Sequence, residues 1–451
     1  MSYPVLSKAT ATDLDREAME FTSFTLQESI SMSFFLDLNI RSNFVEDKMY
    51  VTRLLSLYRK SPEALAQPPP EGPNSGYLVL QDEDSTSTTC FGLCNNSFTT
   101  NLPFPQNKSP IIQHKSDKNT TNYPLFLIPV INQPLSSHQY YAIKNEGNHK
   151  GEAYTSSTED NRQTSCFCIS NIRDKKTKEL NPIDKKQQFE FSFTTKCGNS
   201  MFRVKSVASY CHPPTFMRNG GWRLWNSDQK NFTLGVADGL NYALRARLPD
   251  FNFLPSEECS KVLLVGEWYT PFMFVKERTP KEQVKRSMFY EVKLEQIWKR
   301  IYYHKNNGTE GNIVSFNVTI PTQRVKVNGK EAVEISNETN DRASAGVQWF
   351  RVIDNYNGDG SRIGLSSLIV ERMMWEQERV GWSNNTEKQA NIARVEEYRT
   401  YDGTYKMFAC YMLVERFVFK RMDGSIALSF DFNHTHQLRI KWVDVWTIFD
   451  K

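Results

Sequence analysis

Residues 411–432, YMLVERFVFKRMDGSIALSFDF, decide the fold of this chain. Apolar side chains dominate the two stretches Tyr411–Lys420 and Ile426–Phe432, and Asp423-Gly424 lies between them. An Asp-Gly pair between two such stretches is typical of a β-hairpin whose type I′ turn has positive φ at both central residues. His434–Trp442 follows as a further strand candidate. The sequence therefore predicts a three-stranded antiparallel meander near the C-terminus.

The same kinds of signal recur earlier in the chain. Asn328-Gly329 predicts a second hairpin of the same turn type. Apolar residues alternate along 290–298, although Gln296 interrupts them, so helix and strand compete in that segment. Helical spacing predicts a helix over 51–58 and another within Asp238–Arg247, and Pro280 could begin a third. Further strand candidates are Tyr77–Leu80, Phe126–Ile131, Gln139–Lys144, Phe189–Thr194, Val262–Trp268 and Phe272–Lys276.

These signals predict a mainly β protein with minor helices (α+β), built from two β-rich units with antiparallel hairpins and meanders. Residues 1–48 show no sustained period, and we expect a weakly ordered N-terminal extension there. A boundary near residue 258 then separates an N-terminal β-rich domain, 49–258, from a C-terminal one, 259–451, that contains the meander.

The composition is that of a globular protein and excludes some classes. Lys and Arg total 55 against 51 Asp and Glu, so the net charge is +4 and we expect no nucleic-acid partner. The longest apolar stretch, 123–131, is far shorter than the roughly 18 residues of a membrane helix. Acidic residues in the first 20 positions argue against a signal peptide. A cytoplasmic or nuclear location is therefore expected.

His434 and His436 form the most site-like pair in the sequence. On an unbroken strand both imidazoles share one face, which suits a metal, but no third ligand can be identified. Two pairs of cysteines are close in sequence: Cys90 with Cys94, and Cys166 with Cys168. Each pair could be buried apolar side chains as readily as zinc ligands. We therefore expect no metal and no cofactor.

The segment 371–382 is rich in charge and tryptophan. Glu376 and Glu378 could act as an acid–base pair, but only within a cleft that a sequence cannot show. A solvated helix face is the plainer interpretation of the charges. Trp375 and Trp382 have the setting of sugar-stacking residues, with core packing as the alternative. The binding candidates are therefore Trp375, Glu376, Trp382, His434 and His436, and no catalytic residue can be assigned.

Ten strings carry a resemblance to a known family: Met49–Arg53, Tyr58–Pro62, Pro68–Tyr77, Cys90–Cys94, Leu102–Lys108, Asn132–Ser137, Arg245–Phe253, Trp375–Trp382, Lys420–Ser425 and His434–Gln437. Together they resemble the plant proteins of domain of unknown function 1262. The resemblance implies a plant protein without assigned catalytic residues or ligand, and some members of that family are linked with insecticidal crystal toxins. No amphipathic pore-forming helical hairpin is visible here. The pattern begins at an internal Met, so residues 1–48 are expected to come from upstream initiation or a gene-model extension.

Three functional hypotheses remain open at this point. The first is a non-catalytic module that binds a protein partner, a carbohydrate or another small ligand. The second is an enzyme, a hydrolase or a metal-dependent one, with an unrecognised site near His434 and His436. The third is a membrane-surface or pore-forming protein.

Overall fold

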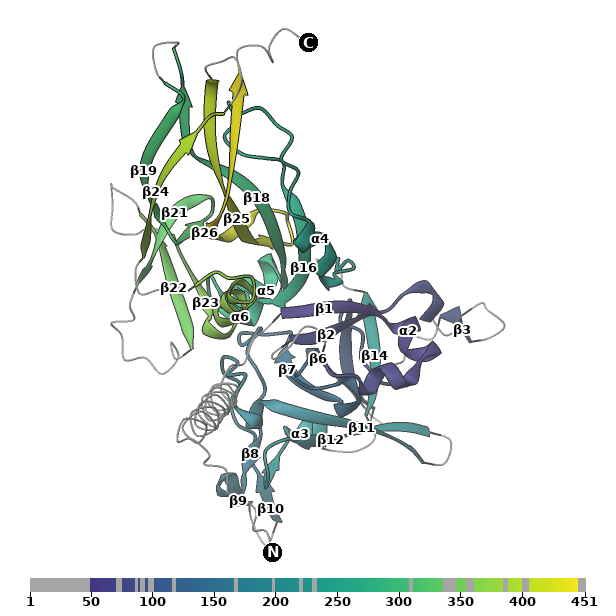
Figure 1. Ribbon diagram of the computed structural model, residues 1–451. Coiled ribbons are helices and arrows are strands. Elements are labelled where there is room, and N and C mark those ends of the chain that lie inside the picture. Colours follow the sequence, from purple (N-terminus) through teal and green to yellow (C-terminus); the bar gives the residue numbers. More distant parts are fainter. Residues whose placement is uncertain are drawn as a thin grey trace, which may run out of the picture. The chain divides into compact units, whose positions relative to one another are not determined.

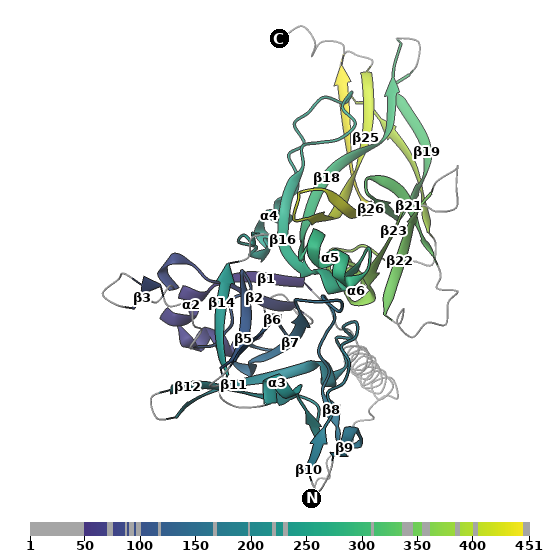
Figure 2. The same ribbon diagram turned by 180° about the vertical axis from the view of Figure 1, so that it is seen from behind.

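The computed structural model describes residues 49–444 with internal gaps, and Figures 1 and 2 show it from opposite sides. The predicted extension, 1–48, lies outside the described residues. No helix of the described residues is long and apolar enough to span a membrane. The gaps within 49–444 are 70–74, 86–87, 90–93, 96–100, 116–118, 166–168, 197–198, 219–221, 229–232, 308–310, 336–345, 354–360, 384–387 and 400–404.

The fold class is confirmed: the protein is mainly β, with antiparallel sheets and short helices. The described α-helices are α2 (Leu55–Lys60), α3 (Thr215–Arg218), α4 (Tyr242–Arg247), α5 (Pro280–Arg286) and α6 (Ser367–Glu378). The 3-10 turns are η1 (Pro62–Ala66), η2 (Glu83–Ser85), η3 (Leu135–Ser137), η4 (Glu159–Asn161), η5 (Lys185–Gln187) and η6 (Phe272–Phe274).

A twelve-stranded sheet contains most of the second half of the chain. Its neighbouring strands are antiparallel except for β1 and β2, which are parallel and largely buried, as parallel strands usually are. In spatial order the strands are β17 (Val275–Lys276), β23 (Arg362–Ser366), β22 (Val347–Val352), β21 (Lys330–Ile335), β20 (Gln323–Val327), β26 (Ile426–Asp444), β25 (Tyr405–Arg421), β18 (Phe289–Lys305), β16 (Leu263–Pro271), β1 (Met49–Leu54) and β2 (Ser75–Leu80), with β15 (Gly239–Leu240) also on β16.

A six-stranded sheet and four two-stranded ribbons complete the described strands. The six-stranded sheet has its own aromatic core, in which Phe104 contacts the rings of Tyr140, Phe191 and Phe202. Its order is β12 (Asn199–Ser206), β11 (Gln188–Lys196), β7 (Gln139–Lys144), β6 (Thr120–Pro129), β5 (Lys108–Lys115) and β14 (Arg223–Asp228). The ribbons are β19 (Ile313–Pro321) with β24 (Gln389–Glu397), β9 (Arg162–Ser165) with β10 (Ile169–Ile172), β8 (Ser157–Thr158) with β13 (Cys211–His212), and β3 (Thr88–Thr89) with β4 (Cys94–Asn95).

The boundary that we predicted at residue 258 stays a prediction. β1 and β15, which precede it, hydrogen-bond to β16, which follows it. The helix predicted over 51–58 is wrong in its first half, because Met49–Leu54 is strand β1 and only Leu55–Lys60 is helical. Burial of β1 between β2 and β16 overrides the local helical spacing.

The C-terminal hairpin is longer than the sequence indicated. His434–Trp442 is no third strand, because it continues β26, which pairs with β25 along almost its whole length. The register shifts where Met412 faces Leu438 and Leu413 faces His434, so residues 435–437 form a bulge with no register partner on β25. β18, β25 and β26 thus lie side by side as three long antiparallel strands (Figure 2).

The two hairpin turns differ from each other. Asn328 and Gly329 both have positive φ, which confirms the predicted type I′ turn. At Asp423-Gly424 only the glycine has positive φ, and the Gly424 amide donates to the carbonyl of Arg421. The prediction for this turn is wrong: it is a three-residue loop that ends in a left-handed glycine.

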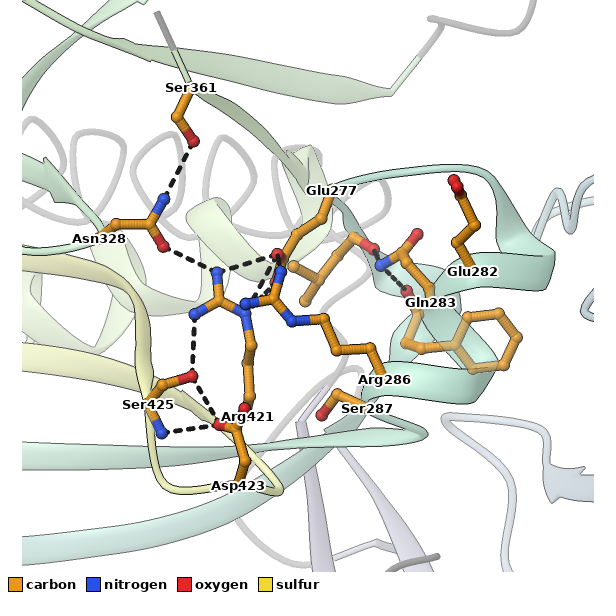
Figure 3. Close-up of polar contacts among 12 residues, drawn as sticks. Glu277, Glu282, Gln283, Arg286, Ser287, Asn328, Ser361, Arg421, Asp423 and Ser425 are labelled. Atoms are coloured by element: carbon orange, nitrogen blue, oxygen red, sulfur yellow. Dashed lines mark hydrogen bonds and ion pairs between the residues drawn. The ribbon is translucent and has the colours of Figure 1, made fainter.

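A buried ion pair joins the two turns to Glu277, in the short segment between β17 and α5 (Figure 3). Arg421 donates from Nη2 to both Glu277 Oε2, at 2.9 Å, and Asn328 Oδ1, at 2.8 Å. The same guanidinium donates from Nη1 to Ser425 Oγ at 3.1 Å. Arg421 therefore fixes the shape of its own turn and holds the Asn-Gly turn against it.

Candidate functional site

The predicted candidates in 371–382 lie on or directly after α6, which covers the core face of the large sheet. Ile369, Val370 and Met373 of this helix are buried in the main core. The helical spacing carries Arg372, Glu376 and Gln377 inward as well, and each is at most 2% exposed. The interpretation of a solvated face is therefore wrong for these three polar residues.

Facing them are polar residues at the core-facing positions of the long strands. Gln296 of β18, Glu415 of β25 and His434 of β26 replace apolar residues in otherwise apolar rows. Arg245 of α4 enters from the side. We call these seven residues the buried ionic network: Arg245, Gln296, Arg372, Glu376, Gln377, Glu415 and His434.

Arg245 connects the two carboxylates of the network. Its Nε and Nη2 donate to Glu415 Oε1 and Oε2 at 2.9 and 2.6 Å. Its Nη1 donates to Glu376 Oε2 at 3.0 Å, and Nη2 also reaches the Glu376 backbone carbonyl at 2.9 Å. Arg372, one helical turn before Glu376, donates to Glu376 Oε1. Two guanidinium groups thus balance two carboxylates in a site that excludes water.

The pKa directions agree with this pairing. Burial alone would raise the pKa of Glu415, but the hydrogen bonds and charge of Arg245 outweigh it and hold the pKa below its usual value. Burial acts in the opposite sense on Arg245, whose pKa is nevertheless raised by its contacts with Glu415 and Glu376. Both partners are therefore charged at neutral pH.

His434 stays neutral under the same conditions. Burial lowers the pKa of its imidazole to about 4. The tautomer follows from the neighbours: Gln377 Nε2 donates to Glu415 Oε2 at 2.7 Å, so Gln377 Oε1 faces the ring. His434 Nε2, 2.9 Å from that oxygen, must carry the proton and donate it. His434 is thus a fixed hydrogen-bond donor in the core.

A surface group of aromatic and arginine side chains lies above the network. Arg379 stacks over the rings of Trp375, at 4.5 Å, and Tyr242, at 5.3 Å. Its Nη1 donates to the Tyr242 hydroxyl at 3.3 Å and lies 3.7 Å from Glu376 Oε1. Tyr242 is 48% exposed. We call Tyr242, Trp375 and Arg379 the surface stack.

The network and the surface stack are mechanically linked. Arg245 and Tyr242 both belong to α4, whereas Glu376 and Trp375 both belong to α6. The buried pair between Arg245 and Glu376 therefore fixes the two helices against each other. That contact sets the spacing of the aromatic rings at the surface.

The remaining candidates lie close by but differ in exposure. Trp382 is buried, with its ring edge-on to Phe432 at 5.1 Å, so it is a core residue. His436 is exposed, and its ring centroid is 5.5 Å from that of His434. Because His434 is buried and His436 is exposed, the two imidazoles do not present a shared open face to a ligand, although their rings are in edge-to-face contact.

Among the described residues, no group of three or more His, Cys, Asp or Glu side chains could hold a metal ion. The first of the candidate cysteine pairs includes Cys90, and the second consists of Cys166 and Cys168; these three lie outside the described residues.

Sequence reasoning missed three residues that complete the network: Arg245, Gln377 and Glu415. The i,i+4 spacing of Arg372 and Glu376 predicts their contact on a helix, and the ion pair confirms it. Glu415 left a signal, because a lone acid within the apolar stretch Tyr411–Phe419 marks a buried charge that needs a partner. Gln296, which interrupts an apolar alternation, is a second such signal. Arg245 left none, because its partners come from distant parts of the chain.

The fold and site define a mainly β protein with a charge-balanced polar core beneath an aromatic surface group. Residues 71–167 match the family described as protein of unknown function (DUF1262). No match was found among the curated proteins.

Several solved structures resemble this chain distantly. The crystal structure of Cry35Ab1 matches with a TM-score of 0.35 and 12% identity, over 75% of this chain and 90% of that one. A likeness at this level carries no argument about function.

Proposed function

We propose that this protein is a non-catalytic binding module whose ligand contact is the surface stack of Tyr242, Trp375 and Arg379. The observation that carries the proposal is that α4 and α6 are clamped by buried ion pairs so that these three side chains meet at the surface. A plant origin and a cytoplasmic or nuclear location remain part of the proposal.

The candidate catalytic groups are already engaged elsewhere. Glu376 is 1% exposed and bonded to two arginines, and His434 is fully buried and neutral. A general acid or base must reach a substrate atom within hydrogen-bond distance. These two side chains reach only protein groups, which supports binding over catalysis.

A protein partner fits the surface stack better than a sugar does. Tyr, Trp and Arg are the residue types most enriched at the energetic centres of protein interfaces. Arg372 and Arg379 lie over the Trp375 ring at 4.7 and 4.5 Å, so the ring is less open for a sugar to stack on. A carbohydrate or other small ligand remains the alternative within this class.

The test compares three forms of the protein on a glycan array and in quantitative pull-downs. Trp375→Ala should lose the ligand that wild type retains, while Tyr210→Ala should keep it, because Tyr210 is 92% exposed and does not belong to the surface stack. A ligand that Trp375→Ala retains as well as wild type would place binding elsewhere. Empty arrays and identical pull-downs for all three forms would leave the proposal without support.

The enzyme hypothesis retains His436 as its exposed candidate. His436→Ala should leave ligand binding unchanged if the proposal holds. Hydrolytic activity that disappears in His436→Ala, but persists in Trp375→Ala, would favour the enzyme instead.

A further inference from the structure

The β19–β24 ribbon has one face against the long strands and one face open to solvent. Val314, Phe316 and Ile320 of β19 are buried against Phe408 and its neighbours, whereas the alternate residues are exposed. Figure 1 shows β19 and β24 side by side. The ribbon therefore has a fixed inner and outer face.

The direction of the β24 backbone follows from two hydrogen bonds at the ribbon ends. The amide of Tyr398 donates to the carbonyl of Asn312 at 2.8 Å, and the amide of Thr322 donates to the carbonyl of Lys388 at 3.0 Å. Antiparallel pairs alternate between bonded and non-bonded positions, so every even-numbered residue of β24 bonds to β19. Ala393, Val395 and the other odd-numbered residues therefore direct their N–H and C=O groups away from β19.

This outer edge has no partner within the described part of the chain, where β24 pairs with β19 alone. Natural edge strands usually carry a Pro, a Lys or a bulge that prevents pairing with another chain. Gln389–Glu397 contains no Pro or Lys and pairs in continuous register. Val395, on this edge near the C-terminal end of β24, is 70% exposed.

The charges on β24 select one way in which the edge could pair with itself. With Val395 opposite Val395 of a second copy, Arg394 lies opposite Glu396 of that copy, and two-fold symmetry repeats the pair. A shift of two residues in one direction places Arg394 against Arg394. A shift of two residues the other way places Glu396 against Glu396. Like charges directly opposite each other destabilise a sheet and opposite charges stabilise it.

The same register also matches the apolar side chains. It places Ile392 opposite Tyr398 of the second copy, an aromatic and β-branched pair of the kind that stabilises antiparallel sheets. The two Val395 side chains, exposed in one copy, meet across the two-fold axis. In a single copy Arg394 and Glu396 are already neighbours on one face, with Nη1 and Oε1 3.6 Å apart.

We propose that two copies of this chain associate by antiparallel pairing of their β24 edges about Val395. The occupant of the edge is a second copy because the pattern of charge and apolar residues is self-complementary. The ribbon is separate from the surface stack, so this inference stands independently of the proposed function.

The first test uses proline, which cannot donate a backbone hydrogen bond. The Val395 amide points away from β19, so Val395→Pro removes a donor to the second copy and none within the ribbon. Ser315→Pro is the matched control, because Ser315 occupies the equivalent outward position on the opposite edge, on β19. Sedimentation equilibrium over a wide concentration range should show dimers for wild type and Ser315→Pro, and monomers for Val395→Pro.

The second test uses charge and does not depend on how proline is tolerated. Arg394→Glu should weaken dimerisation by about ten-fold or more, because two attractive cross-strand pairs become repulsive. Combining Arg394→Glu with Glu396→Arg restores both pairs and should restore the dimer. Hydrogen exchange should show protection of the Ala393 and Val395 amides that increases with concentration.

Each contrary outcome overturns the proposal. A wild-type chain that stays monomeric at its highest soluble concentration excludes it. So does a dimer that survives both Val395→Pro and Arg394→Glu, or one that Ser315→Pro abolishes while Val395→Pro does not. If the charge-swapped double variant dimerises no more tightly than Arg394→Glu, the stated register is excluded.

Discussion

Replacing Arg245 with Met tests the energetic role of the buried ionic network. The side chain of Arg245 is 6% exposed and those of Glu376 and Glu415 are each 1% exposed. Met keeps much of the apolar volume but removes the donors to both carboxylates. Arg372 then remains as the single network guanidinium for two buried negative charges. Removing one partner of a buried ion pair costs about 3–5 kcal/mol of folding stability. We therefore expect Arg245→Met to lower the free energy of unfolding by about 3–5 kcal/mol.

The loss should be smaller when the charge balance is restored. Arg245→Met combined with Glu415→Gln leaves Arg372 paired with Glu376 and no excess charge in the core. We expect this double variant to be more stable than Arg245→Met alone, by about 2 kcal/mol, because neighbouring residues of one network couple strongly. Urea unfolding followed by circular dichroism at neutral pH gives the free energies of unfolding of wild type, Arg245→Met, Glu415→Gln and the double variant.

The pH dependence gives an independent check on the same variant. In the wild type the pKa of Glu415 is lowered, so its stabilising contribution is present above the unfolded value of 4.5 and is lost as the pH falls below it. Without Arg245, burial raises that pKa instead, so Arg245→Met should recover part of its deficit as the pH falls. A loss below about 1 kcal/mol, or additive effects in the double variant, would refute the reasoning.

Two further predictions concern His434 and Gly266. The folded pKa of His434 is about 4 against 6.5 for the free side chain, so its contribution to folding stability is complete above pH 6.5 and is lost towards pH 4. His434→Gln should remove about 3 kcal/mol of this pH dependence of the free energy of unfolding, measured in urea. An unchanged pH dependence in the variant would contradict the burial argument. A Cβ on Gly266 would lie 2.4 Å from the buried Trp268 ring, so Gly266→Ala should cost about 1–3 kcal/mol, measured as a lower Tm. Gly311→Ala is the control, because nothing lies within 4 Å of its Cβ; equal Tm values for the two variants would contradict the clash.

The sequence by itself determined the class of fold and many of its parts. Alternating apolar residues, Asn-Gly and Asp-Gly pairs and Pro280 are local signals, and they located the long hairpin, the Asn328 turn and α5 correctly. Such signals depend on neighbours within a few residues, which the sequence displays directly. The local signals were wrong at β1, where helical spacing predicted a helix but burial between two strands favours a strand.

Only the tertiary structure decided the character of the candidate site. Glu376 and His434 looked like accessible candidates, yet Arg245, Arg372, Gln377 and Glu415 enclose them in a balanced, dry network. A buried charge is stable only beside its partner, and the partners here are separated by up to 170 residues of chain. Spacing along the sequence cannot reveal such a partnership, because folding alone brings α4, α6 and the long strands together.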